Sequence, residues 1–245
     1  MRFVNGFAAV LLGFMLIASC SQPSVSEPPQ AYTPEPVVEA PVKPKVFNIP
    51  EDCGGTLTAE QRMYLELIQK MVEQGQYYGA LANLQQLEKS AAATPQTVYL
   101  RAEALRKTGQ YDAAAGEYQK LFSGCMAGYG LHGYGLLASA RGDQAIAEDY
   151  LQRASRERPV DANIHNDFGV VLMLRGRYAE ANKEFMTALE LDRSNRLPVE
   201  NLIVLLLLEK QEQQAELLAK ESGVSSQDFE RLSQRAERVA SQPSL

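Results

Sequence analysis

A phrase of about ten residues recurs along the chain every 33 or 34 residues, and this period constrains the fold more than any other feature. The copies are "GQYYGALANL" at Gly75, "GQYDAAAGEY" at Gly109, "GDQAIAEDYL" at Gly142 and "GRYAEANKEF" at Gly176. A further 34 residues leads to Lys210, where "KQEQQAELLA" is a copy without the glycine. A fixed period of this length is typical of an array of helix-turn-helix units, which bury their apolar faces only by stacking.

The residues around each turn share one pattern. An alanine stands five positions after the turn residue and allows two helices to approach closely; this position holds Ala80, Ala114, Ala147, Ala181 and Ala215. Four positions further, on the same helical face, stand Leu84, Tyr118, Leu151, Phe185 and Ala219. Seven positions before the glycine, where we expect the paired helix to press in, stand Ala102, Gly135 and Gly169.

This period and pattern resemble the tetratricopeptide repeat, most specifically in "DANIHNDFGVVLMLRGRYAEANKEFMTALELDRSN". The resemblance implies an all-α superhelix of about five helix-turn-helix repeats within 51–224, at 61–94, 95–127, 128–161, 162–195 and 196–224. Residues 225–245 follow as a capping helix and tail. There Ser225 or Ser226 can cap a helix, with Asp228 in its first turn, and one face carries Phe229, Leu232, Ala236 and Val239.

The N-terminus predicts export and a lipid anchor. Residues 1–19 have the short apolar run of a signal peptide, too short for a spanning helix. Ile17-Ala18-Ser19-Cys20 resembles a bacterial lipobox, and this resemblance implies that acyl chains are attached covalently to Cys20. Several acyl chains on one residue anchor a protein firmly in a membrane. By the same resemblance, Ser21 in place of Asp implies the periplasmic face of the outer membrane. An ordinary signal peptide or an uncleaved anchor is the alternative.

The segment that follows predicts a tether. Eight of the chain's twelve prolines lie between residues 21 and 50. Because proline removes a backbone donor and disfavours helix before it, we expect 20–50 to be a semi-extended linker between the lipidated cysteine and the repeats.

Composition and motifs exclude several classes of function. The net charge is -6 and no block of Lys or Arg occurs, which argues against nucleic acid. His132 and His165 have no cluster of cysteines or carboxylates at ligand spacing, so we expect no metal site. The glycines of "GYGLHGYG" (128–135) follow helix-packing spacing rather than that of a phosphate loop. We expect no catalytic residues, no cofactor, no small-molecule substrate and no enzyme activity.

Two cysteines remain after Cys20. In an exported chain an even pair favours a disulfide, here between Cys53 and Cys125, which would pin the entry segment along the array. The alternative is two separated thiols, one of them buried.

A protein partner is expected on the groove formed by the first helix of each repeat. In the geometry of the family, groove positions lie six, three and two residues before the turn, and they change from charged (Glu103, Arg106) to apolar along the chain. The apolar candidates are Leu136, Val170, Met173, Leu174, Val204, Leu207 and Leu208, and the polar candidates at the edge are Tyr129, His132, Asn166 and Asn201. Two interpretations stay open: a partner segment fills this surface, or the C-terminal helix folds back onto it.

The anchor and repeats together resemble the TadD lipoproteins of Flp (tight adherence) pilus assembly, most strongly over residues 160–236. The resemblance implies a scaffold that assists assembly or localisation of the outer-membrane secretin or other pilus components. The alternatives are a type IV pilus pilotin, or an adaptor for cell-wall enzymes or outer-membrane protein assembly. The sequence leaves the oligomeric state and the bound partner segment undetermined.

Overall fold

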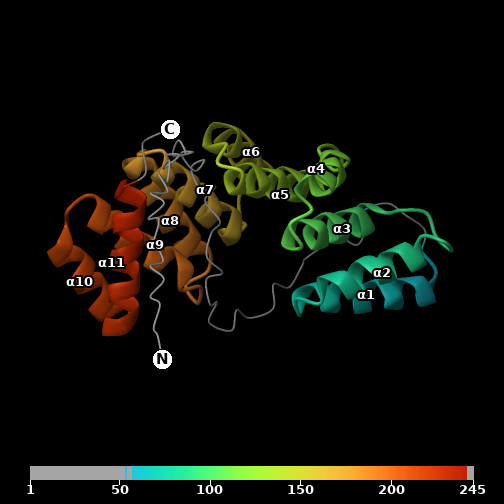
Figure 1. Cartoon of the computed structure of the whole chain (residues 1–245), viewed down its shortest axis with the longest axis horizontal. Coiled ribbons are helices and arrows are strands. Elements are labelled where there is room, and N and C mark those ends of the chain that lie inside the picture. The colour runs from blue at the N-terminus through green and yellow to red at the C-terminus, as the bar shows by residue number, and fades with distance from the viewer. Residues whose placement is uncertain (1–52, 54–56, 242–245) are drawn as a thin grey trace, which may run out of the picture. The chain divides into compact units, whose positions relative to one another are not determined.

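The computed structural model describes Cys53 and residues 57–241 (Figure 1). The predicted signal peptide, Cys20, the tether and the last four residues lie outside this part. The described residues form eleven helices and no strand, which confirms the all-α fold. No described helix has the length and apolar content needed to cross a bilayer.

The first ten helices form five consecutive antiparallel pairs. They are α1 (Ala59–Glu73) with α2 (Tyr77–Leu87), α3 (Pro95–Lys107) with α4 (Tyr111–Gln119), α5 (Ala127–Ala140) with α6 (Gln144–Glu157), α7 (Ala162–Leu174) with α8 (Tyr178–Leu191), and α9 (Leu197–Leu208) with α10 (Glu212–Glu221). The second helix of each of the first four pairs also packs on the first helix of the next pair. The last helix is α11 (Ser226–Ser241).

A residue in the left-handed region closes the first helix of each pair. Gly109 has φ 77° and Gly176 has φ 72°, a conformation that glycine adopts without steric cost. In the fifth copy, which lacks the glycine, Lys210 takes the same conformation with φ 60°. The repeat therefore keeps its turn even where the sequence has lost the residue that favours it.

The small residues of the repeat allow close contact between the helices of a pair, as predicted. Ala147 and Ala181 are fully buried, and so are the large residues Leu151 and Phe185 four positions later. A β-carbon added at Gly169 would lie 2.6 Å from Cε1 of Phe185, so the aromatic ring fills the space that a side chain would need.

The glycines of α5 serve packing in the same way. A β-carbon at Gly133 would lie 2.1 Å from Cε1 of Tyr118, and one at Gly135 would lie 2.8 Å from Cγ of Leu151. The glycine-rich stretch is thus part of a helix that contacts α4 and α6, as its spacing indicated.

Candidate partner-binding surface

The candidate groove residues lie on the first helices of three consecutive pairs. Helix α5 carries Tyr129, His132 and Leu136; α7 carries Asn166, Val170, Met173 and Leu174; α9 carries Asn201, Val204, Leu207 and Leu208. Consecutive first helices contact one another from α1 to α9, so these residues belong to neighbouring surfaces.

Equivalent positions of the three repeats differ in exposure. Leu136 and Val170, six residues before their turn glycines, are partly exposed, whereas the equivalent Val204 is fully buried. Met173 is also buried, with 1% of its surface exposed. Met173 and Val204 therefore do not line an open groove, contrary to expectation, because both belong to the core of the C-terminal half.

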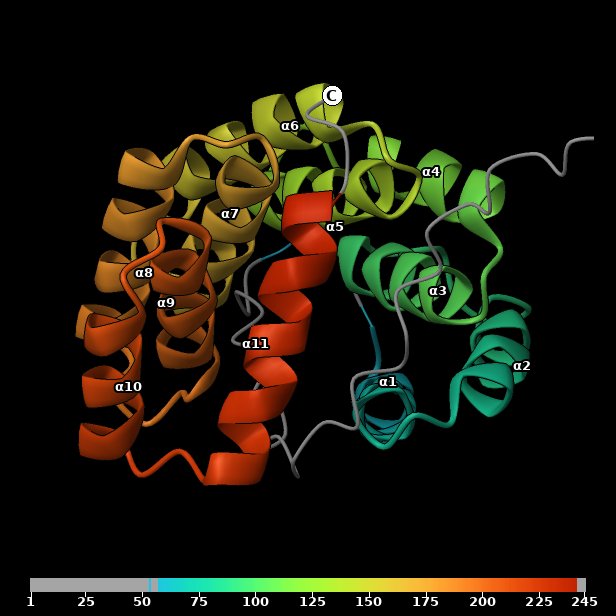
Figure 2. The same ribbon diagram turned by 60° about the vertical axis from the view of Figure 1, so that its left-hand side comes forward.

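Helix α11 contributes to the core in which α9 is buried. It runs alongside α9 (Figure 2) and packs mainly on it rather than on α10. Leu232 and Ala236 of α11 share a core cluster with Val204, and Leu207 and Leu208 pack partly buried against that cluster. The C-terminal helix thus folds back over the last repeat, while Leu136 of α5 and Val170 and Leu174 of α7 stay partly exposed.

An open cleft remains where α9 and α11 meet. Its apolar wall comes from Leu207, Leu208, Phe229 and Ala236, while Lys210, Glu212, Glu216 and Glu237 place charges around it. Two of the predicted groove residues therefore face a cleft that the chain's own last helix helps to build.

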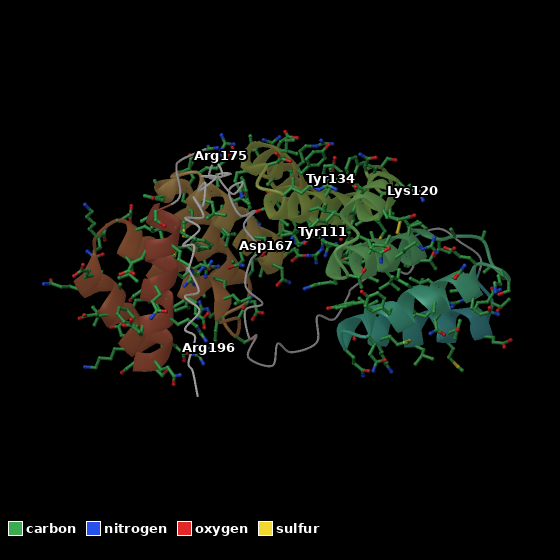
Figure 3. All side chains as sticks on the ribbon, viewed as in Figure 1. Tyr111, Lys120, Tyr134, Asp167, Arg175 and Arg196 are labelled. Atoms are coloured by element: carbon green, nitrogen blue, oxygen red, sulfur yellow. A yellow bond between two sulfur atoms is a disulfide. The ribbon has the colours of Figure 1, made fainter. Side chains whose placement is uncertain are left out.

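The polar candidates link helices to one another. Asn201 Nδ2 donates to Asn166 Oδ1 at 2.8 Å, and Asn166 Nδ2 donates to Asp167 Oδ1 at 3.2 Å. The other oxygen of Asp167, a residue labelled in Figure 3, lies 2.8 Å from His132 Nε2. Asn166 and Asn201 are buried, and burial requires such partners. This chain of contacts links α5, α7 and α9 and fixes the position of each helix relative to the next.

Asp167 was not among the predicted residues. It directly follows the candidate Asn166, which stands one repeat of 34 residues after His132, and this place beside a candidate position was the available signal. Its carboxylate joins the two candidates, so it belongs to the same polar chain.

Tyr129 is buried rather than available to a partner. Its ring lies 5.2 Å from that of Tyr99, and the Arg158 guanidinium carbon lies 3.8 Å from its ring centre, within the range of a cation–π contact. Burial raises the pKa of the Tyr129 hydroxyl, while the charge of Arg158 opposes the rise.

The charged groove positions of the second repeat bond to the core. Glu103 and Arg106 form an ion pair at 2.8 Å, and Arg106 Nε donates to the Tyr118 hydroxyl at 3.2 Å. The Tyr118 hydroxyl also donates to Glu103. Burial and the charge of Glu103 raise the pKa of Tyr118 well above its usual value. Burial alone would lower the pKa of Arg106, but Glu103 and Tyr118 together raise it.

Cys53 and Cys125 are joined in the structure. Their Cα atoms are 5.5 Å apart and the bond closes a separation of 72 residues. Cys53 is buried in a cluster with Tyr99, Met126 and Tyr129, whereas Cys125 is exposed just before α5. The bond fixes Cys53 against the second and third repeats.

Each histidine has its own protein partners. His165 Nδ1 lies 2.7 Å from Glu184 Oε2, and its Nε2 lies 3.0 Å from the Pro159 carbonyl oxygen. The hydrogen bond to Glu184 raises the pKa of His165, against the effect of burial. The described residues contain no group of three His, Cys, Asp or Glu side chains that could hold a metal ion.

Known proteins share this repeat pattern. The tetratricopeptide repeat profile matches residues 66–122 and 135–196. TPR repeat-containing protein PA4299 of Pseudomonas aeruginosa is 36% identical over 187 residues, which cover 76% of this chain and 75% of that protein. The chain belongs to the tetratricopeptide repeat family.

Solved structures of tetratricopeptide repeat architecture match the fold. The MamA protein of Desulfovibrio magneticus RS-1 aligns with a TM-score of 0.52 and 17% identity, covering 76% of this chain and all of that one. YrrB, described as a TPR protein with an unusual peptide-binding site, aligns with a TM-score of 0.51 and 18% identity, covering 71% of this chain and 90% of that one. At these identities the likeness extends to the fold alone.

Proposed function

We propose that this protein is a lipid-anchored, periplasm-facing scaffold that binds a segment of a protein partner on the inner surfaces of α5 and α7. The observation that carries the proposal is the difference between equivalent positions: Leu136 and Val170 are partly exposed, whereas Val204 is buried in the core cluster that includes residues of the last helix. Proteins of this family act through protein–protein contacts rather than catalysis, and YrrB is described as binding a peptide.

The surface has the chemistry of a peptide site. Leu136, Val170 and Leu174 offer apolar contact on two adjacent helices, and the His132–Asp167 pair lies on the same two helices as a polar group. A short amphipathic segment matches such a surface, because its apolar side chains gain burial while its polar groups meet the pair. The neighbouring Asn166–Asn201 contact keeps the helices fixed before binding, which lowers the entropic cost of association.

The finer proposal concerns place and partner. The lipobox-like Ile17-Ala18-Ser19-Cys20 supports acylation of Cys20 and attachment to the inner face of the outer membrane, with 20–50 as tether. The resemblance to TadD supports a role in assembling or localising the secretin of a Flp pilus. Replacement of Cys20 by alanine should abolish lipid labelling and membrane fractionation but leave the repeats folded; membrane retention without lipid labelling would instead indicate an uncleaved anchor.

The partner surface is tested by charge insertion. Val170→Glu and Leu136→Glu should each lower partner recovery at least tenfold in a pull-down from solubilised outer membrane, while the circular dichroism spectrum stays helical. Ile146→Glu is the matched control, because Ile146 is 47% exposed but lies on α6, the second helix of its pair. Equal recovery by all three variants would contradict the α5–α7 surface.

The identity of the recovered proteins tests the cellular role separately. Recovery of a pilus secretin that depends on Val170 would support the Flp pilus proposal. Recovery of cell-wall hydrolases or barrel-assembly proteins without secretin would contradict that role and favour the adaptor alternative, and a type IV pilus secretin would favour a pilotin.

A further inference from the structure

Helix α1 presents two opposite apolar faces. Leu65, Ile68 and Val72 are buried against the array. On the opposite side, Met63 is 71% exposed and Leu67 is 52% exposed, one helical turn apart. A helix at the surface of a protein normally has one apolar face, so the second face of α1 needs an explanation.

The position of this face in the array makes it unusual. A repeat array requires a polar cap at each end, because the outer face of a terminal repeat has no neighbour. At the C-terminal end, α11 covers α9. In the described part of the chain, no helix covers the outer side of α1, and Met63 and Leu67 form an apolar stripe there.

The margin of the stripe is fixed by α2. The Tyr64 hydroxyl donates to Asn83 Oδ1, and Asn83 Nδ2 lies 3.7 Å from the sulfur of Met71. A β-carbon at Gly79 would lie 2.7 Å from Cε of Met71, so this methionine is packed down on α2. These contacts hold Tyr64 and Met71 as partly buried neighbours of the exposed pair and leave a preformed surface.

Charges of opposite sign stand at the two ends of the stripe. Glu60 lies one turn before Met63, and Lys70 lies one turn after Leu67. Both are exposed, and neither side chain forms an ion pair or hydrogen bond in the described part of the chain. The order along one face is therefore negative, apolar, apolar, positive.

This order is complementary to itself when reversed. In an antiparallel pair of α1 helices related by a two-fold axis near residue 65, Met63 of one copy meets Leu67 of the other. In the same register Glu60 of each copy reaches the level of Lys70 of the other. A single two-fold contact thus aligns four apolar side chains and places an ion pair at each end, as isologous helix pairs do.

We propose that a second copy of this chain docks on α1 through this antiparallel contact. The seam is one helix wide, so the dimer is reversible and forms with rising concentration rather than being obligate. The contact uses the first helix only, so it leaves the α5–α7 surface free, and its failure would not affect the proposed partner site.

The experiment measures the mass of the full chain by sedimentation in a density-matched detergent across a concentration series. The native chain should shift from monomer to dimer. Lys70→Glu places Glu60 opposite a second carboxylate, and Glu60→Lys places Lys70 opposite a second ammonium group. Each variant should weaken dimerisation at least tenfold, because like charges then meet at both ends. The double variant Glu60→Lys/Lys70→Glu restores opposite charges and should recover the dimer.

Glu221→Lys is the matched control, since Glu221 is equally exposed but lies on α10, and it should leave the dimer unchanged. All three substituted positions are exposed, and an unchanged melting temperature will show that each of the four variants folds. A native chain that stays monomeric at every concentration overturns the proposal, and indicates that residues before 53 or another protein cover α1. If dimerisation is as strong in both single charge-reversal variants as in the native chain, the proposed register is wrong.

Discussion

The two halves of the array are held together by different means. From α5 to α11, one large cluster of aliphatic side chains, Met173, Phe168 and Phe185 runs through the repeats and includes Leu232 and Ala236 of the C-terminal helix. From α1 to α5, the core is divided into smaller clusters, and the second of them contains Cys53 and several tyrosines. The first half therefore combines smaller apolar clusters with a disulfide, whereas the second half has one larger and continuous apolar cluster.

This difference matters because a repeat array is stabilised mainly by contacts between neighbours. Where the core is continuous, each repeat is supported on both sides. Where it is divided, stability must come from features that join distant segments, such as the bond between Cys53 and Cys125. Perturbations of each kind should therefore act on one half and spare the other.

The largest effect is expected from the cross-link. The double variant Cys53→Ser/Cys125→Ser removes a disulfide that joins two residues 72 positions apart in the sequence. In the chain-entropy model this costs about 4 kcal/mol. Native-state hydrogen exchange should show lost protection in α1 to α5 while the amides of α9 are little changed. Equal loss in both halves would contradict the division of the core, and two free thiols in the unfolded, non-reduced protein would show that the bond is absent.

A smaller effect is expected at the C-terminal cap. Leu232→Ala removes a side chain that is 2% exposed between α11 and α9, and should lower the free energy of unfolding by roughly 3 kcal/mol. Leu217→Ala, on the neighbouring α10, is the control: that side chain is 56% exposed and its loss should change stability by less than about 0.5 kcal/mol. Urea unfolding measures both. Similar values for the two variants would mean that α11 does not cap the array.

The boundary between the halves can be probed with glycine. Gly133→Ala forces a methyl group into the ring of Tyr118, and should destabilise by roughly 2 kcal/mol. Gly116→Ala, in α4, meets nothing within 4 Å and should stabilise by about 0.5–1 kcal/mol, since alanine favours helix. Thermal unfolding should therefore move in opposite directions for the two variants. A stabilising Gly133→Ala would show that Tyr118 is free to move.

Local repetition is what the sequence predicts well. The period placed the turn at Lys210, although glycine is absent there, and the alanine positions placed the contacts between paired helices. The candidate surface was harder to predict. The periodic positions treat Leu136, Val170 and Val204 as equivalent, but the last of them is buried in a core to which α11 contributes. A repeat pattern contains no information about the return of α11.

Contacts between side chains of different helices could not be predicted from the sequence either. His132 and Asn166 were identified as polar groups facing a partner, but their hydrogen bonds depend on how α5, α7 and α9 are rotated against each other. Glu103 and Arg106 were likewise identified as charged groove residues. Both form hydrogen bonds with the Tyr118 hydroxyl, and these bonds depend on the packing of α4 on α3.

The smallest change in stability is expected from the titration of His165, and it should be confined to the second half of the array. The hydrogen bond to Glu184 raises the pKa of His165, which favours the charged imidazole in the folded state. The contribution of this hydrogen bond to the free energy of unfolding is therefore complete below the unfolded-state pKa of about 6.5. It is lost as the pH rises through the higher pKa of the folded state. We expect the stability difference between the native chain and His165→Gln to be at most about 1 kcal/mol at pH 5.5 and to shrink toward alkaline pH.

The partner of the pair provides the control for this pH dependence. Glu184→Gln removes the carboxylate that holds the charged imidazole, so it should abolish the same pH-dependent component even though His165 is still present. Amide exchange in α7 and α8 should follow the titration while α1 and α2 stay unaffected, because the helices that pack on α7 and α8 are α5, α6 and α9. A difference that grows with pH would have the wrong sign, and would show that burial outweighs the bond to Glu184.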